Sequence, residues 1–326
     1  MTNRFSHRRQ FWFFLTLVTA FKLFLVCHQA LAQQPSQPSN KAAVESADKE
    51  NDEEERRRMF RSFKSRRQSA ASNRTRIPPK NPPAVKPTAA DSVSSEDAFV
   101  GFTVWEMRES GSGTERRSFK LKKPGGESVV LRPFRLGSDS QLVTGRSYVF
   151  SIESARTGYL YIIDREQYAD GKLGEPLLLF PTKSVHGGSN RIESGDPVEI
   201  PDQKSESAYF EATRSDQNHI GEVLTIIVSP KPLIEPARLM DDPITLPVDE
   251  VKKWEQQWAT KTRWAENVEA VGLPYTEEEG HAGADPSYKL RESDPLPQRL
   301  YQVGSKGGDP LVVSLLLRYR ESANPE

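Results

Sequence analysis

Histidines carry most of the acid–base chemistry that this sequence offers, because its only cysteine is Cys27. Three histidines lie beyond the N-terminal region: His186, His219 and His281. Each falls in a predicted loop, no two are close in sequence, and none has the spacing of a zinc-ligand pair. A hydrolase site would have to join His186 and His219 to distant Ser, Asp or Glu side chains, since no Gly-x-Ser-x-Gly motif is present. The sequence therefore predicts no catalytic residue.

Metal and phosphate sites are not predicted either. Residues 164–171 (DREQYADG) have the acidic character of a calcium loop, but they lack the final glutamate and flanking helices of an EF-hand. Asp170-Gly171 is instead typical of a turn. The glycine pairs at 125–126, 187–188 and 307–308 lack the Lys-Ser/Thr that follows a phosphate-binding loop. No cofactor is expected.

Residues 1–32 have the pattern of a signal peptide. Arginines at positions 4, 8 and 9 precede an apolar run over 11–26, and Ala30-Leu31-Ala32 supplies a small-x-small cleavage site. An uncleaved membrane anchor is the alternative, although the run is a little short for a span of about 20 residues. The arginine pair also leaves the twin-arginine route open beside the general secretory one. We expect a periplasmic or extracellular protein.

Removal of this segment would change the chemistry of the chain. Cys27 lies within it, and Val26 before the cysteine argues against lipidation, so the mature chain would have neither disulfides nor thiol chemistry. The net charge of the whole chain is +0, and the segment carries only basic charges. A mildly acidic mature protein gives no reason to expect a nucleic-acid partner.

Residues 33–97 are predicted to be a disordered linker that is charged and rich in proline. Few aliphatic residues occur there, and the whole chain is only 36% hydrophobic, against about 45–50% in typical globular domains. Such a segment cannot bury enough surface to offset its chain entropy. Within it, four acidic residues at 52–55 precede a basic stretch over 56–67 that contains Met59, Phe60 and Phe63.

The order of charges in this part of the linker suits the dipole of a helix. A transient helix there would make a weak contact with an anionic membrane, or with an acidic partner, through residues 56–67. A solvated tether with protease-sensitive arginine pairs is the favoured alternative, because three apolar residues provide little binding free energy.

Residues 99–320 are predicted to form a single β-rich domain organised around Gly145–Asp164. Apolar side chains alternate in both halves of this segment, as Tyr148, Phe150 and Ile152, then Tyr159, Tyr161 and Ile163. Because strand side chains alternate with a period of two, and a short Gly-containing connection separates the halves, we expect a β-hairpin. The Tyr-rich hairpin and its flanking loops are the expected contact surface, because tyrosine offers apolar area with a polar tip. Tyr159 and Tyr161 are nevertheless expected to pack within the sheet and not to do chemistry.

Further short strands are predicted at 99–108, 119–122, 129–136, 177–180, 197–201, 208–212, 221–229, 301–303 and 311–319. The segment 221–229 is the most apolar, which favours a central position, and 311–319 would close the domain. Many short strands with frequent turn signals are typical of an antiparallel β-sandwich or a partly open barrel.

One amphipathic C-terminal helix is predicted over 247–271. Trp254 and Trp258 lie on its apolar face, which favours packing of the helix against the sheet. An aromatic ligand platform that includes Trp264 is the alternative. Residues 275–297 are predicted to be loop.

Several motifs occur in the order found in a known family. Gly158-Tyr159-Leu160-Tyr161 is followed by Asp170-Gly171, by Leu179-Phe180-Pro181 and by Ile200-Pro201. Over about residues 99–233 this order resembles the bacterial domain of unknown function 4384 family. The resemblance implies a β-rich, non-catalytic module of exported or multidomain bacterial proteins, with no catalytic residues to carry over. The tryptophan-containing helix and the late strand depart from that pattern.

The sequence thus predicts an exported, non-catalytic β-sandwich module of the bacterial cell envelope that binds an unidentified protein, envelope component or ligand. A hydrolase or an enzyme-associated subunit is one alternative. A structural protein tethered to the membrane by an uncleaved signal anchor is the other.

Overall fold

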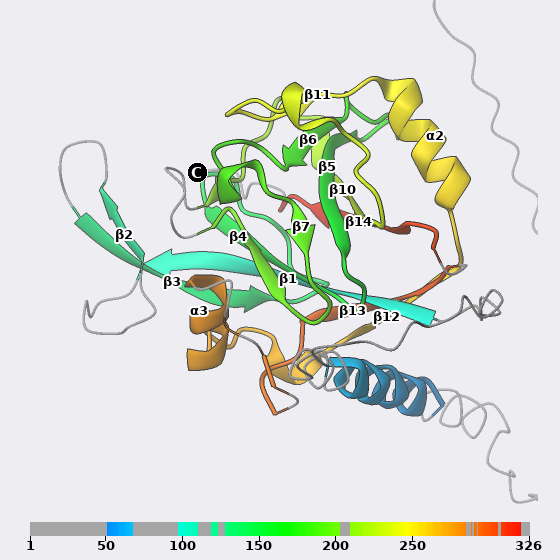
Figure 1. The fold of residues 1–326 in the computed structure, drawn as a ribbon. Coiled ribbons are helices and arrows are strands. Elements are labelled where there is room, and N and C mark those ends of the chain that lie inside the picture. Colours follow the sequence, from blue (N-terminus) through cyan, green and yellow to red (C-terminus); the bar gives the residue numbers. More distant parts are fainter. Residues whose placement is uncertain are drawn as a thin grey trace, which may run out of the picture. The chain divides into compact units, whose positions relative to one another are not determined.

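The computed structural model describes residues 51–67, 97–109, 119–122, 128–202, 209–284, 288, 290–291, 293–305 and 308–320 (Figure 1). The predicted signal peptide and most of the predicted linker lie outside these residues. Residues 48–326 form one structural unit. No helix in the described part of the chain is both long enough and apolar enough to cross a membrane.

The fold is mainly β, with two antiparallel sheets, as the alternation of apolar residues predicts. The first sheet has the order β12-β13-β1-β3-β2, and β4 pairs with β1, β8 and β9. Its strands are β1 (Asp97–Glu109), β2 (Phe119–Lys122), β3 (Ser128–Leu136), β4 (Ser147–Ser154), β8 (Pro197–Ile200), β9 (Phe210–Glu211), β12 (Thr262–Glu266) and β13 (Arg299–Gly304).

The second sheet has the order β11-β6-β5-β10-β14, with β7 paired to β5. Its strands are β5 (Gly158–Tyr168), β6 (Leu177–Phe180), β7 (Arg191–Ile192), β10 (His219–Ser229), β11 (Ile244–Thr245) and β14 (Leu311–Arg318). The most apolar segment is β10, which lies between β5 and β14. Its predicted central position is confirmed.

The predicted hairpin over Gly145–Asp164 is wrong, although both of its strands exist. β4 pairs with β1 in the first sheet, and β5 pairs with β10 in the second. The backbone N–H groups around the connection donate to other segments, from Ala155 to the carbonyl of Phe99 at 2.9 Å and from Leu160 to that of Asn190 at 2.8 Å. Side-chain period identifies a strand but not its partner, so the sequence pattern could not separate a hairpin from a crossover between sheets.

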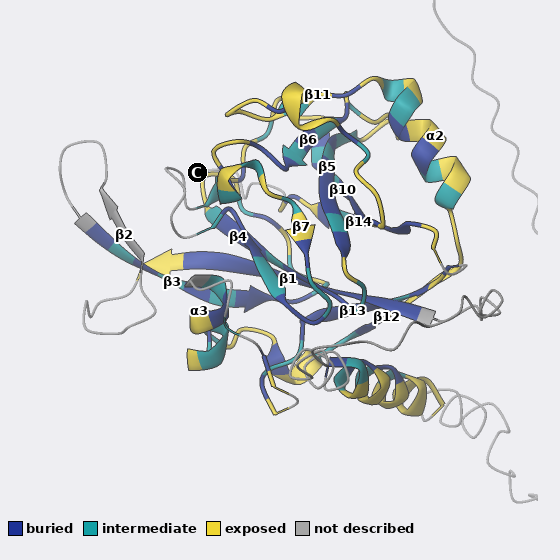
Figure 2. Ribbon diagram, viewed as in Figure 1, coloured by how far each residue is buried: buried dark blue, intermediate teal, exposed yellow. Residues whose placement is uncertain are grey.

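One apolar core joins the two sheets (Figure 2). Phe102 and Ile152 of the first sheet pack in the same buried cluster as Ile162 and Ile226 of the second. We call the faces that meet there the inner faces. The other residues of each strand, such as Trp105 on β1, point to the outer faces.

The helix α2 (Val248–Trp258) covers the outer face of the second sheet. Trp254 is buried there and stacks on Trp258 with 6.3 Å between the ring centroids, which agrees with packing of this helix on the sheet. The predicted extension of the helix to residue 271 is wrong. Residues Thr262–Glu266 instead form β12, whose pairing with β13 outweighs the local helical pattern.

Four further helices are short: η1 (His186–Gly188), η2 (Pro236–Arg238), η3 (Val268–Ala270) and α3 (Glu277–Ala284). α3 lies in a segment predicted to be loop. A reciprocal capping box begins it, because Glu279 accepts the Thr276 N–H at 2.9 Å and donates its own N–H to the Thr276 hydroxyl at 3.3 Å.

Residues 51–67 form a helix that packs on the outer face of the first sheet, so disorder of this part of the predicted linker is wrong. Met59 and Phe63 are buried against Phe99, Ala265 and Leu300. The Phe63 and Phe99 rings meet edge to face at 6.2 Å. Because Met59 and Phe63 face the domain, they are not exposed to form the apolar patch expected to touch a membrane.

Candidate ligand-binding pocket

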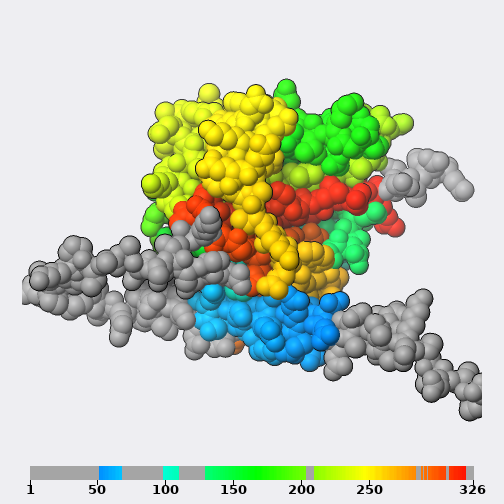
Figure 3. All heavy atoms as spheres, turned by 90° about the vertical axis from the view of Figure 1, so that its right-hand side faces the viewer, coloured from blue at the N-terminus to red at the C-terminus, as the bar shows by residue number. Residues whose placement is uncertain are grey.

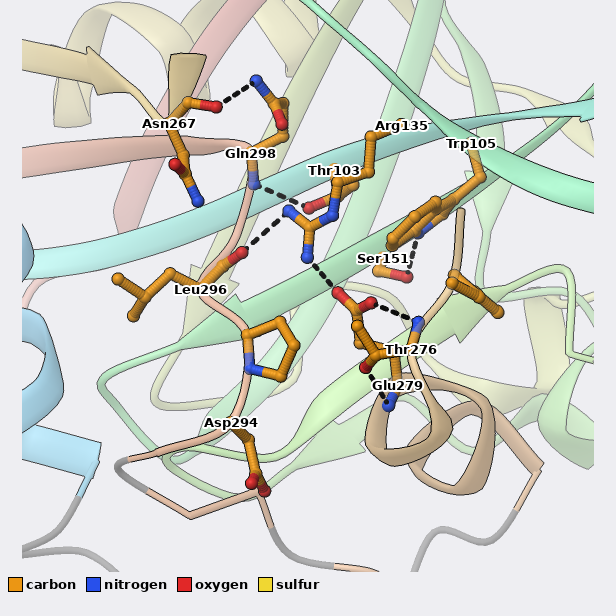
Figure 4. Close-up of polar contacts among 12 residues, drawn as sticks. Thr103, Trp105, Arg135, Ser151, Asn267, Thr276, Glu279, Asp294, Leu296 and Gln298 are labelled. Atoms are coloured by element: carbon orange, nitrogen blue, oxygen red, sulfur yellow. Dashed lines mark hydrogen bonds and ion pairs between the residues drawn. The ribbon is translucent and has the colours of Figure 1, made fainter. Parts of the chain in front are cut away.

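A small pocket lies on the outer face of the first sheet, beneath α3 and the segment at 290–297 (Figure 4). β1 and β4 supply its floor through Thr103, Trp105 and Ser151, and the Trp105 indole N–H donates to the Ser151 hydroxyl at 2.8 Å. Glu153 and Glu199 also line it, from β4 and β8. The register places Ser151 opposite Glu199, so alternate residues of neighbouring strands converge here.

Arg135 lies beside the pocket and contacts three of its lining residues. Its guanidinium lies 4.8 Å from the centre of the Trp105 ring, donates to the Leu296 carbonyl at 2.8 Å and pairs with the carboxylate of Glu279 on α3 (Figure 4). Both Arg135 and Glu279 have buried side chains. A desolvated pair of this kind holds α3 over the pocket, because removal of one partner would leave the other charge buried.

Glu153, which lines the pocket, forms a buried ion pair with Arg67, the last described residue of the 51–67 helix. Their side chains are only 4% and 2% exposed, and Arg67 Nε donates to Glu153 Oε1 at 2.7 Å. The guanidinium also donates to the carbonyls of Arg291 and Asp294 at 3.2 Å and to that of Pro295 at 3.3 Å. Burial raises the pKa of Glu153, and the Arg67 charge opposes this rise.

Glu199 is held by a tyrosine. The Tyr275 hydroxyl donates to Glu199 Oε2 at 2.5 Å, and both side chains are buried. Burial, with the negative charge of Glu199, raises the pKa of Tyr275 well above its usual value. The tyrosine therefore stays protonated and serves as a donor.

The cavity measures about 30 Å³, which is room for about two water molecules. Glu153 and Glu199 are both engaged by protein partners, so neither is poised as a free acid or base in this arrangement.

His186 has a structural environment in η1. Its Nε2 lies 2.8 Å from the carbonyl oxygen of Glu199, and its backbone N–H donates to Asp202 Oδ2 at 2.8 Å. His281 is exposed on α3 and stacks on Tyr288. Among the described residues, no contact joins any two of the three histidines.

His219 begins β10, and its ring is buried, contrary to its predicted loop position. Nδ1 accepts the backbone N–H of Ser215 at 3.1 Å and lies 3.3 Å from the Ser215 hydroxyl oxygen. Nε2 lies 3.2 Å from Glu222 Oε1. A serine, a histidine and a glutamate thus lie in the order of a catalytic triad. However, the nitrogen that would take the serine proton already accepts a backbone N–H, and these contacts hold the loop that leads into β10.

Three carboxylates that the sequence analysis did not predict as a group lie near this histidine. Glu166 on β5 is directly opposite Glu222 on β10, and Asp164 lies two residues earlier on the same face. Burial, then the charge of Glu222, raises the pKa of Asp164 well above its usual value. The alternation of Asp164 and Glu166 places both on one face of β5 and could have predicted that they lie close together. Glu222 could not be added from sequence, because only the register with β10 brings it beside them. Among the described residues, no cluster of three or more His, Cys, Asp or Glu side chains is arranged to hold a metal ion.

Asp164→Asn is expected to stabilise the fold at neutral pH. A carboxyl whose pKa is higher in the folded than in the unfolded chain binds protons more tightly when folded, so its contribution becomes unfavourable as pH rises above about 4, the unfolded pKa. A tenfold difference in proton affinity between the folded and unfolded chain corresponds to about 1.4 kcal/mol. Urea unfolding from pH 3 to pH 8 should show a gain in stability for Asp164→Asn that grows with pH. A constant difference would contradict the buried, protonated carboxyl.

The tyrosines at 148 and 161 are buried, so the expected contact surface on the 145–164 segment is wrong for these two side chains. The Tyr161 hydroxyl accepts the Leu233 N–H at 2.8 Å, which uses its polar end within the protein. The large exposed apolar side chains lie elsewhere: Leu173, Met240, Trp264, Val268, Val271 and Leu273.

No protein-family model matches the chain, and no curated protein or solved structure does so either. The resemblance to the domain of unknown function 4384 family therefore stays a prediction.

Proposed function

We propose that the chain is an exported, non-catalytic β-sandwich module that binds a protein of the bacterial cell envelope. One observation supports this most: Trp264 stands 55% exposed on β12, the last strand of the first sheet, beside the docked 51–67 helix. Exposed tryptophans are costly to hydrate and are enriched at the centres of protein interfaces. The export route and the envelope location rest on residues 1–32.

Trp264 belongs to a surface that suits a protein partner. It lines a groove of about 440 Å³ together with Val268 of η3 and Met59 and Arg56 of the 51–67 helix. In Figure 3 the helix lies against the segment that contains β12. Arginines and acidic side chains of both elements surround this apolar centre: Asp52, Glu55, Arg263 and Glu266 also line the groove. An apolar centre with a charged rim is the usual arrangement of a protein interface.

Replacement of Trp264 by alanine should remove this binding. The bait is the mature chain from Gln33, because a fragment that began at Phe99 would lack the helix that forms one wall of the groove. The measurement is the yield of a partner that is chemically cross-linked to the bait in envelope extract. We expect this yield to fall at least about ten-fold for Trp264→Ala, as for an interface hot spot. Leu173→Ala, which removes an exposed apolar side chain on another loop, should leave the yield unchanged. Equal yields with both variants would contradict the proposed surface.

A further inference from the structure

The 51–67 helix is held by three side chains on one face. Met59, Phe63 and Arg67 are its only buried residues within the described chain. They follow one another at intervals of four, so they form a single stripe along the helix. The first two fill the apolar depression formed by Phe99, Ala265 and Leu300.

Arg67, the third of these side chains, enters a socket whose acceptors suit a guanidinium. Glu153 provides a carboxylate, and the carbonyls of Arg291, Asp294 and Pro295 surround the remaining donors. A planar guanidinium matches such a set of acceptors, whereas a lysine ammonium has no fork of donors. The charge of Arg67 opposes the cost of burying Glu153, so the socket without a cation would hold an uncompensated carboxylate.

The rest of the helix fits its surroundings loosely. Grooves of about 520 and 300 Å³ run along its two sides, each lined by the helix and by β-sheet or loop residues. Most of its other side chains are partly or fully exposed. Residues 68–96 separate its end from β1, so the helix is a tethered occupant and not a continuation of the sheet. A covalent connection between two binding elements can raise their local concentration to about the millimolar range.

We call the surface that receives Met59, Phe63 and Arg67 the helix-binding groove; Phe99, Ala265, Leu300 and Glu153 form it. We infer that this groove recognises an amphipathic helix of a partner protein that carries two apolar residues and then an arginine, each four residues after the last. In the free chain the 51–67 helix occupies the groove and competes with that partner. Proteins that bind a helix in an apolar groove commonly recognise it through side chains that lie along one such stripe. This site goes beyond the Trp264 surface, because a partner helix bound in it would displace the 51–67 helix, which forms one wall of that surface.

Cutting the chain between the 51–67 helix and β1 should free the helix-binding groove for an added peptide. A specific protease site is placed between residues 68 and 96 of the mature chain, and the probe is a fluorescent peptide with the sequence of residues 51–67. After cleavage and dilution, we expect the peptide to bind the cleaved chain at least 100-fold more tightly than it binds the uncut chain. A peptide with Arg67→Gln should bind at least ten-fold more weakly than the unaltered peptide.

Two protein variants complete the experiment. Glu153→Gln in the cleaved chain should abolish the preference for arginine, whereas Glu175→Gln, at an exposed position on another face, should not. Equal binding of the two peptides, equal binding to cut and uncut chain, or unfolding on cleavage would each overturn the inference. If the peptide binds as expected but Trp264→Ala leaves envelope capture unchanged, the groove stands and the proposed function through Trp264 fails.

Discussion

Replacement of Arg67 by alanine is expected to destabilise the protein by about 3–5 kcal/mol, the usual cost of removing one member of a buried ion pair. The loss leaves the Glu153 carboxylate buried at 4% exposure, and it frees the carbonyls of Asp294 and Pro295 from their donor. Urea unfolding at pH 7 measures the difference.

The pH dependence of this variant identifies the cause. Burial raises the pKa of Glu153, and without Arg67 the folded-state pKa should rise further. A carboxyl with a raised folded pKa destabilises the fold increasingly as pH rises above about 4.3. The cost of Arg67→Ala should therefore shrink as pH falls towards 4.

A neighbouring arginine and a double variant serve as controls. Arg66→Ala should cost within about 1 kcal/mol, as is usual for a partly exposed charged residue. Arg67→Met combined with Glu153→Leu should recover much of the loss, because an apolar pair of similar volume replaces both charges. A small, pH-independent effect of Arg67→Ala, equal to that of Arg66→Ala, would show that the buried pair does not form.

Tyr161→Ala is expected to cost about 3–5 kcal/mol, the range for removal of a large side chain from a core. Tyr161 is 1% exposed and packs with Ile163, Ile227 and Trp254 between β5, β10 and α2. The truncation also leaves the Leu233 N–H without its acceptor. Thermal unfolding should show a strongly lowered midpoint or no folded state.

Tyr161→Phe separates packing from hydrogen bonding. It keeps the ring and removes only the acceptor for Leu233, so we expect a loss of about 1 kcal/mol. An unchanged midpoint for Tyr161→Ala, with binding lost, would assign this tyrosine to a recognition site instead.

Local patterns in the sequence predict most of the strands. The bounds of β2 and β6 agree with the prediction, and those of β1 and β14 differ by only one or two residues. This agreement reflects the period of two, which depends on neighbouring residues alone. Pairing depends on residues far along the chain, so the same pattern led to a wrong hairpin for β4 and β5.

The 51–67 helix shows the same limit. Its charge order and apolar residues predicted helical tendency, but three buried side chains do not hold a helix unless a complementary surface exists. That surface comes from Phe99, Ala265, Leu300 and Glu153, which are distant from it in sequence. The pocket beneath α3 is equally invisible in any one segment, because strand register brings Trp105, Ser151 and Glu199 together.

Hydrogen–deuterium exchange over residues 51–67 tests most directly whether the first sheet holds this helix through the Arg67 socket. We expect protected amides in the wild-type chain and fast exchange in Arg67→Ala, with Arg66→Ala remaining protected. Fast exchange in the wild type, or equal protection in Arg67→Ala, would contradict this expectation.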